Sequence, residues 1–175
     1  MKDFKVEKIK LIAFDVDGVL TNGEIFYTDE GVEIKSFNCK DGQGIAMLVK
    51  AGYITAIITA RESAIVNKRA SDLGITHVYQ GAKNKLVAME ELLEKYKLDF
   101  SQVAYVGDDL PDICILEKAG LACCPSDAVE EVKNVCNFIA QKQGGQGAVR
   151  EVTDLIYYGN LKKGAPPISL PAFKN

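Results

Sequence analysis

The chain has 175 residues, of which 47% are hydrophobic and 26% charged, and its formal net charge at pH 7 is -3. This apolar content is enough for one buried core and too little for two. The small net charge leaves no electrostatic footprint for nucleic acid or an anionic membrane, and no apolar run is long enough to cross a bilayer. We therefore expect one domain whose partner is a small molecule.

The N-terminal residues and the cysteines indicate the cellular compartment of the protein. Residues 1–10 alternate charged and apolar side chains and contain no stretch of signal-peptide type. The five cysteines form an odd set without a Cys-x-x-Cys pair, which is typical of free thiols in a reducing compartment. We expect a cytoplasmic protein.

Four short apolar runs stop abruptly at polar or turn-forming residues, as buried parallel strands do where they reach a site. These runs are residues 10–14, 54–58, 103–106 and, less clearly, 120–124. Segments of helical periodicity accompany them at residues 44–51, 63–73, 85–96, 111–119 and 148–157. Alternating strands and helices form right-handed crossovers, with helices on both faces of a parallel sheet. The predicted fold is a doubly wound, Rossmann-like α/β domain.

One stretch breaks this alternation. Residues 23–37 form two extended runs around Asp29-Glu30-Gly31, which is the signal of a β-hairpin. Because the hairpin directly follows the first strand, we expect it to lie over or beside the site as a flap, or to form a subunit contact. Residues 1–158 then make up the domain. Residues 159–175 contain several prolines and no periodicity, which predicts a C-terminal arm.

Polar side chains follow the predicted strands at their carboxyl ends, which converge on one crevice in an open parallel sheet. Carboxylates gathered in this way repel one another unless a cation neutralises them, and magnesium is a hard ion that binds carboxylates and phosphate oxygens. A lysine that opens a helix can add positive charge, and a threonine can donate to a phosphate oxygen. This combination indicates phosphoryl transfer. The residues concerned are Asp15, Asp17, Thr59, Lys85, Asp108, Asp109 and Asp112.

The order of these residues resembles the motif set of the haloacid dehalogenase superfamily of phosphotransferases. Its first motif is similar to Asp15-Val16-Asp17-Gly18-Val19 at the end of the first predicted strand. Thr59 follows a later strand, Lys85 opens a helix, and Gly107-Asp108-Asp109-Leu110-Pro111-Asp112 comes last. A lone Asp-x-Asp is more commonly a solvated turn or a helix cap. The matching order of the other residues favours the functional interpretation.

The resemblance implies catalysis through a covalent intermediate. Asp15 would attack phosphorus and become an aspartyl-phosphate. Asp17 would protonate the leaving oxygen and later activate the hydrolytic water. Thr59 and Lys85 would complete the catalytic set by holding the phosphate.

The same resemblance implies a magnesium site. The Asp15 carboxylate, the Asp17 backbone carbonyl and Asp108 would bind Mg2+. Asp112 would lie behind these ligands and orient a metal-bound water or the catalytic lysine. Asp109 is expected to cap a helix beside the ligand rather than to bind the ion.

Three further segments resemble the small subfamily that lacks a large cap domain. They are the short hairpin, the turn Lys40-Asp41-Gly42-Gln43-Gly44 and residues 144–151, within a likeness that covers residues 9–156. The subfamily implies hydrolysis of an eight-carbon sugar-acid phosphate in lipopolysaccharide precursor synthesis. It also suggests a homotetramer in which the C-terminal arm closes a neighbouring site. The implied substrate-binding residues are Asp17, Asn38, Lys40, Asp41, Gly42, Arg61, Arg69 and Lys85, of which the two arginines suit a substrate carboxylate.

Three positions depart from the subfamily pattern and leave the substrate open. Gln146 and Lys40 stand where arginine is common, and Asn84 stands where an acidic residue often precedes the lysine. The alternative within the same chemistry is a nine-carbon, sialic-acid-like sugar 9-phosphate. We favour the eight-carbon acid because Arg61 directly follows the motif threonine and an alanine, and because Gly147-Ala148-Val149-Arg150-Glu151 is intact.

Two alternatives belong to other classes. A signalling receiver domain also gathers acidic residues, a threonine and a lysine around magnesium, but its phosphoacceptor ends a central strand, where this chain has Thr59. A non-catalytic oligomerisation module would be expected to lose Asp15 or Asp17, and both are present. Turnover of a sugar phosphate separates both alternatives from the enzyme.

Overall fold

The computed structural model describes residues 5–161 and contains an α/β domain with a short antiparallel hairpin. The α-helices are α1 (Cys39–Lys50), α2 (Ala64–Leu73), α3 (Lys85–Tyr96), α4 (Ile113–Leu116), α5 (Glu130–Val135) and α6 (Ala148–Leu161). The strands are β1 (Leu11–Phe14), β2 (Phe26–Tyr27), β3 (Glu33–Ile34), β4 (Ile54–Ile58), β5 (His77–Tyr79), β6 (Val103–Val106), β7 (Leu121–Cys124) and β8 (Phe138–Ile139). Three short 3-10 helices complete the elements: Val6–Lys8, Phe100–Gln102 and Leu110–Asp112.

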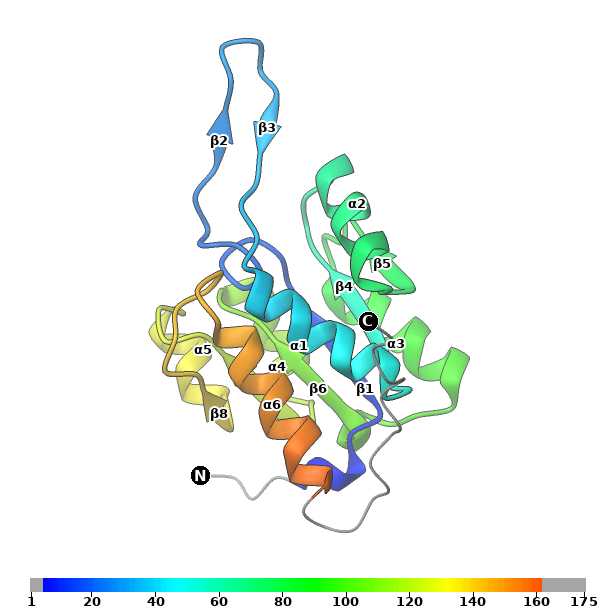
Figure 1. The fold of residues 1–175 in the computed structure, drawn as a ribbon. Coiled ribbons are helices and arrows are strands. Elements are labelled where there is room, and N and C mark those ends of the chain that lie inside the picture. Colours follow the sequence, from blue (N-terminus) through cyan, green and yellow to red (C-terminus); the bar gives the residue numbers. More distant parts are fainter. Residues whose placement is uncertain (1–4, 162–175) are drawn as a thin grey trace, which may run out of the picture.

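Six strands form one parallel sheet in the order β5-β4-β1-β6-β7-β8 (Figure 1). β1 lies between β4 and β6, with Phe14 opposite Ile57 on one side and Val106 on the other. The doubly wound fold expected from the sequence is therefore confirmed. The carboxyl ends of three neighbouring strands lie side by side at the centre of the sheet, which is where such folds place their sites.

The side chains of β1 alternate between two hydrophobic cores. Ile12 and Phe14 face one side, where they join residues of α1, α2 and α6. Leu11 and Ala13 face the other side, where they join residues of α3, α4 and α5. All four side chains are fully buried. Because helices cover both faces, this strand consists only of apolar residues and needs no polar alternation.

The first long helix begins earlier than the sequence predicted. α1 starts at Cys39 rather than at residue 44, so the expected turn at residues 40–44 is helical. The Asn38 side chain caps this helix by accepting from the Lys40 backbone N–H at 2.8 Å. α6 also continues beyond the expected residue 157, to Leu161, and so includes the first residues assigned to the arm. The remainder of the arm, residues 162–175, lies outside the described residues.

Three elements were missed, and one is shorter than predicted. β5, α5 and β8 are each too short to show a period in the sequence. The helix predicted at residues 111–119 is divided into a 3-10 turn and the four-residue helix α4. As expected, Asp109 caps this segment by accepting from the Leu110 N–H at 2.8 Å.

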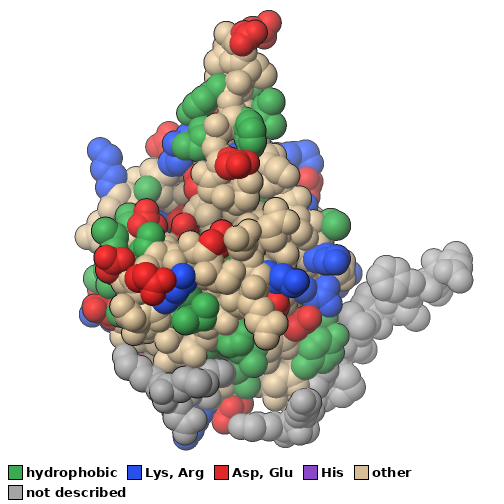
Figure 2. All heavy atoms as spheres, turned by 90° about the vertical axis from the view of Figure 1, so that its left-hand side faces the viewer, with side chains coloured by type: hydrophobic (Ala, Val, Ile, Leu, Met, Phe, Trp, Pro, Cys, Tyr) green, Lys and Arg blue, Asp and Glu red, His purple; other side chains and the backbone are tan. Residues whose placement is uncertain are grey.

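The hairpin formed by β2 and β3 projects from the body of the molecule (Figure 1). Hydrophobic side chains lie along it and acidic side chains lie at its end, as Figure 2 shows. Its exposed apolar residues are Ile25, Phe26, Tyr27, Val32 and Ile34. Within residues 5–161, the helices are all too short or too polar to cross a bilayer.

Candidate active site

The residues that follow β1, β4 and β6 meet in one hollow. Asp15 follows β1 and Thr59 follows β4, while Asp108 lies two residues after β6. Lys85, at the first position of α3, closes the hollow from the side. The predicted residues that line this hollow are Asp15, Asp17, Thr59, Arg61, Lys85, Asp108, Asp109 and Asp112. The structure therefore brings together the predicted catalytic and metal-binding side chains.

Two glycines allow the loops around the site to approach closely. Gly18 has a φ of +84°, and a Cβ atom there would lie 2.0 Å from the Asp108 carboxylate. At Gly144, a Cβ atom would lie 1.8 Å from the backbone oxygen of Gly18. The late glycine-rich segment thus packs directly against the loop after β1, so it is more than a flexible turn before α6.

Lys85 forms two buried ion pairs. Its Nζ atom lies 2.9 Å from Asp15 Oδ2 and 2.7 Å from Asp112 Oδ1, and the side chain is 3% exposed. Asn84 fixes the start of this helix by accepting from the Leu86 N–H at 3.2 Å. Burial works against the charge of Lys85, but the two carboxylates outweigh it and raise the pKa of the ammonium group. The lysine therefore stays positively charged beside Asp15.

Asp112 is completely buried, and each of its two carboxylate oxygens accepts two hydrogen bonds. Oδ1 accepts from Lys85 Nζ and from the Tyr105 hydroxyl, both at 2.7 Å. Oδ2 accepts from the backbone N–H of Asp108 at 3.0 Å and of Asp109 at 3.3 Å. A carboxylate has about four acceptor positions, and these four donors occupy them. The geometry matches a residue that orients Lys85 and the Asp108 loop without binding a metal itself.

Asp15 and Asp108 each keep one oxygen without a partner. Both Oδ1 atoms are buried, and no donor from residues 5–161 reaches them. One ligand atom from each of Asp15, Asp108 and Asp112 lies within 4.8 Å of the other two. Three carboxylates and one ammonium leave two negative charges uncompensated, which a single divalent cation would neutralise. The donor set is oxygen only, as Mg2+ prefers.

The electrostatic cost of this arrangement appears in the pKa values of the two aspartates. Burial, followed by the charge of Asp112, raises the pKa of Asp15 to about 6 against the opposing effect of Lys85. Burial and the charges of Asp15 and Asp112 raise the pKa of Asp108 to about 8. Such shifts mark carboxylates that need a positive partner, and they are common at functional sites.

Asp17 lies in an ion-pair network with Arg61 and with two residues that the sequence analysis did not single out, Lys35 and Glu33. Its Oδ1 pairs with Lys35 Nζ, and its Oδ2 lies 3.6 Å from Arg61 Nε. Glu33 joins both cations, at 3.4 Å from Lys35 and 2.9 Å from Arg61. The pKa of Glu33 is lowered by a hydrogen bond from Ser63 and then by Arg61 and Lys35. The one available signal was the Glu33-Ile34-Lys35 alternation, which places both charges on one face of the strand.

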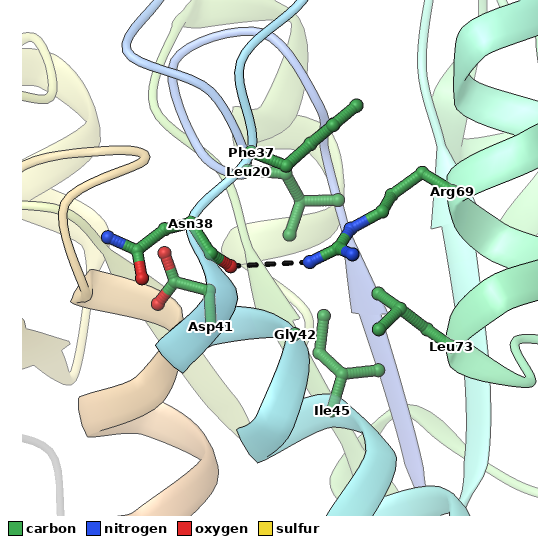
Figure 3. A pocket seen from close by; sticks show the side chains of 8 residues that line it. All are labelled: Leu20, Phe37, Asn38, Asp41, Gly42, Ile45, Arg69 and Leu73. Carbon is green, nitrogen blue, oxygen red and sulfur yellow. Dashed lines mark hydrogen bonds between the residues drawn. The ribbon is translucent and has the colours of Figure 1, made fainter.

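The remaining predicted substrate-binding residues do not line this hollow. They surround a small separate pocket between the base of the hairpin, α1 and α2 (Figure 3). Arg69 Nη2 donates to the Asn38 carbonyl at 3.3 Å, and its guanidinium lies 5.5 Å from the centroid of the Phe37 ring. Gly42 also lines this pocket, whereas Lys40 is exposed beside it.

Asp41 in this second pocket is engaged in holding two helices together. Its carboxylate accepts from the backbone N–H of Gly147 at 3.2 Å and of Arg150 at 2.7 Å, at the start of α6. A carboxylate there satisfies otherwise unpaired N–H groups and complements the helix dipole. Burial still raises the pKa of Asp41 despite these donors. Within one subunit, the geometry gives this residue a structural contact rather than a place at the hollow.

Comparisons with known proteins agree with this geometry. A family model described as haloacid dehalogenase-like hydrolase matches residues 51–152. The chain is 45% identical to 3-deoxy-D-manno-octulosonate 8-phosphate phosphatase KdsC of Escherichia coli (strain K12), over 87% of this chain and 81% of that protein.

Two solved structures are closely similar. A probable yrbi family phosphatase from Pseudomonas syringae is 46% identical with a TM-score of 0.87, over 90% of this chain and 91% of that one. The Moraxella catarrhalis 3-deoxy-D-manno-octulosonate 8-phosphate phosphatase, in complex with magnesium, phosphate and KDO, is 44% identical with a TM-score of 0.88, over 90% of each chain.

Proposed function

Because this chain belongs to the haloacid dehalogenase-like hydrolases, we propose that it hydrolyses 3-deoxy-D-manno-octulosonate 8-phosphate to the free sugar acid and phosphate, in lipopolysaccharide precursor synthesis. The chain is a phosphoric monoester hydrolase, and the proposal adds its substrate and its magnesium dependence. The relatives named above support both. The observation that carries the proposal is the pair of buried, unpartnered oxygens on Asp15 and Asp108.

The proposed reaction has two steps. In the first, an Asp15 oxygen forms a bond to phosphorus while the bond from phosphorus to the sugar oxygen breaks, and Asp17 gives its proton to that oxygen. In the second, water attacks phosphorus as Asp17 takes its proton, and the bond to Asp15 breaks. Lys85 and Thr59 hold the phosphate oxygens from the walls of the hollow.

The chain's own residues would hold the metal. We assign Asp15 and Asp108 to it through their unpartnered oxygens, together with the Asp17 backbone carbonyl. A bound Mg2+ supplies positive charge that neutralises the transferring phosphoryl group. Asp112 contributes by keeping Lys85 and the Asp108 backbone in place.

The residues predicted to bind the sugar-acid end of the substrate are divided between the two pockets. Arg61 lines the hollow and is the first candidate for its carboxylate. Asn38, Lys40, Asp41, Gly42 and Arg69 surround the second pocket or lie beside it. Contact between these five residues and the sugar acid would therefore come at its far end or across a subunit boundary.

The exposed apolar hairpin supports the subunit contact that the sequence suggested. We propose a cytoplasmic homotetramer in which hairpins of different subunits pack together, since five exposed hydrophobic side chains along so short a hairpin form an uncommonly apolar projection. Light scattering on the eluting protein gives the mass directly. A tetramer that Phe26→Ser dissociates would fit the proposal, and a monomeric wild type at working concentration would contradict it.

A substrate panel tests the proposed function. Phosphate release is measured with Mg2+ on the eight-carbon 8-phosphate, a nine-carbon sugar-acid 9-phosphate and simple sugar phosphates. The proposal expects the highest kcat/KM on the eight-carbon acid. A clear preference for the nine-carbon acid would replace the substrate. Absence of turnover on the whole panel would favour a receiver or an oligomerisation module instead.

A further inference from the structure

The hairpin meets the active site through a closed ring of alternating charges. The ring runs from Asp17 to Lys35, on to Glu33, then to Arg61 and back to Asp17. Two of its members, Glu33 and Lys35, come from the hairpin, whereas Asp17 follows β1 and Arg61 follows β4. The Tyr27 hydroxyl accepts a hydrogen bond from Arg61 Nη2 at 3.2 Å, which is the second contact between the hairpin and Arg61 after that of Glu33.

Lys35 occupies an unusual place in this ring. Its side chain is 2% exposed, although lysine is almost never fully buried unless it is paired. It is absent from the lining of the hollow, so it reaches Asp17 from the side of the hairpin. Burying an ammonium is costly unless partners compensate its charge, and here Asp17 and Glu33 both do.

The ring holds the two oxygens of Asp17 differently. Oδ1 is bound by Lys35, while Oδ2 lies at a looser 3.6 Å from Arg61, a residue that lines the hollow. Oδ2 is therefore the more weakly held of the two oxygens. A carboxylate that exchanges protons with a leaving oxygen and with water needs one fixed orientation, because misplacement of a catalytic group by about 1 Å can cost about 100-fold in rate.

We propose that Lys35 is a positioning residue for Asp17: it holds Oδ1 so that Oδ2 is presented to the leaving oxygen and to the hydrolytic water. Glu33 supports this role by holding Lys35 and Arg61 together. The inference rests on the proposed function, in which Asp17 exchanges these protons. It makes the hairpin part of the catalytic machinery as well as a surface for subunit contact.

The proton transfer by Asp17 is needed in some steps of the reaction and not in others. This difference allows the positioning role of Lys35 to be tested. Transfer of phosphoryl to Asp15 needs a proton donor when the leaving group is an alkoxide, and needs none when it is p-nitrophenolate. Hydrolysis of the aspartyl-phosphate needs Asp17 as a base for either substrate. Since kcat/KM reports steps up to the first irreversible one, it isolates the transfer to Asp15.

Lys35→Met is the principal variant. For a sugar phosphate that the wild type hydrolyses, we expect kcat/KM to fall by about 30-fold or more. For p-nitrophenyl phosphate, we expect kcat/KM to stay within about threefold while kcat falls, because only the second step then needs Asp17. Lys35→Arg, which keeps a cationic donor, should recover part of the loss. A purely structural role would lower kcat/KM for both substrates equally.

A double-mutant cycle shows whether Lys35 acts through Asp17. Asp17→Asn should give the same split between the two substrates, with a larger loss. Adding Lys35→Met to it should then cost no more than about a further threefold, because the positioned group is already absent. If the double variant instead loses the full factor of the single Lys35→Met variant, Lys35 acts independently of Asp17 and the inference is wrong.

Two further variants guard against a folding effect. Lys68→Met removes a lysine that is 74% exposed and pairs with Asp72, and it should leave both substrates unchanged within about twofold. If Lys35→Met does not fold, Glu33→Gln takes its place: it keeps Lys35 but removes one of its two partners, and should lower kcat/KM for the sugar phosphate alone by about three- to tenfold.

These experiments separate the two proposals. The choice of sugar phosphate in the substrate panel decides the proposed function, whereas the leaving-group split needs only one alkyl phosphate that the wild type turns over. Equal losses on the two leaving groups would overturn the role of Lys35 and leave the substrate assignment intact. An unchanged Lys35→Met variant would do the same.

Discussion

Buried carboxylates occur in two pockets of the molecule, and they differ in whether their oxygens have partners. In the hollow, Asp15 and Asp108 keep buried oxygens that no described residue reaches. In the second pocket, both oxygens of Asp41 accept backbone N–H groups at the start of α6. The carboxylates of the hollow are incomplete without a cation, whereas Asp41 finds partners for both of its oxygens within the chain. Unsatisfied charge therefore distinguishes the reactive site from the structural one.

The largest expected effect is the loss of the nucleophile. Asp15→Asn should lower kcat by about 10,000-fold or more, since no other carboxylate is placed to form the covalent intermediate. Its thermal midpoint without metal should not fall, because the change removes a buried negative charge. Steady-state assays together with thermal melts check both outcomes. A variant that keeps more than about a tenth of the activity would move the nucleophile elsewhere.

The next effect concerns pH and metal. Asp15 and Asp108 have folded pKa values of about 6 and about 8, above the ordinary value of 3.8. Raised carboxyl pKa values contribute stability that is present below 3.8 and lost as pH rises through 6 and then 8. The metal-free protein should therefore become less stable between pH 5 and 8. Stabilisation by Mg2+ should grow over the same interval.

Asp108→Asn sharpens this prediction. Without metal at pH 8, it should melt at a higher temperature than the wild type, and its melting temperature should respond little to Mg2+. Asp72→Asn, which alters an exposed helix pair, is the matched control and should keep the full magnesium response. A wild-type protein whose Mg2+ stabilisation is the same at pH 5.5 and pH 8 would contradict the account of this cluster.

The smallest effect on activity is expected at Asp41 in the second pocket. Asp41→Ala removes a buried acceptor of two N–H groups and should cost about 1–3 kcal/mol of the free energy of unfolding. For a chain of this size, that corresponds to roughly 2–4 °C in the melting temperature per kcal/mol. Activity on p-nitrophenyl phosphate at low temperature should stay within about twofold.

A surface cap provides the comparison for Asp41. Asp99 also accepts a backbone N–H, from Ser101 at 2.8 Å, but it is exposed, so Asp99→Ala should shift the melting temperature less. If Asp41→Ala instead raised KM for the sugar-acid phosphate at an unchanged melting temperature, Asp41 would be the substrate contact that the sequence predicted.

The core of the site could be predicted because it follows from strand ends. Asp15, Thr59 and Asp108 follow three neighbouring strands, which are apolar in sequence except for Thr55 in β4. Lys85 begins a helix whose bounds, residues 85–96, were predicted exactly as observed, since its apolar period is regular and Asn84 caps it. Local patterns of this kind survive folding because no long-range contact opposes them.

The rest depended on contacts between distant segments. Asp41 sits in a glycine-containing stretch that reads as a turn, yet it belongs to α1 and binds residues more than one hundred positions away. Lys35 follows a strand of only two residues. This strand is too short for the sequence to show on which face the Lys35 side chain lies. Its partner Asp17 is 18 residues away, and their contact depends on how the hairpin leaves the domain.

The most direct test of the central claim is a crystal structure of the protein with Mg2+ and beryllium fluoride, which mimics a phosphoryl group on aspartate. The account predicts a BeF3 group bonded to a carboxylate oxygen of Asp15, with the Mg2+ ion between Asp15 and Asp108 and the Lys85 ammonium in contact with the fluorines. An ion or fluoride group bound in the second pocket beside Asp41, with the Asp15 and Asp108 oxygens still unpartnered, would contradict it.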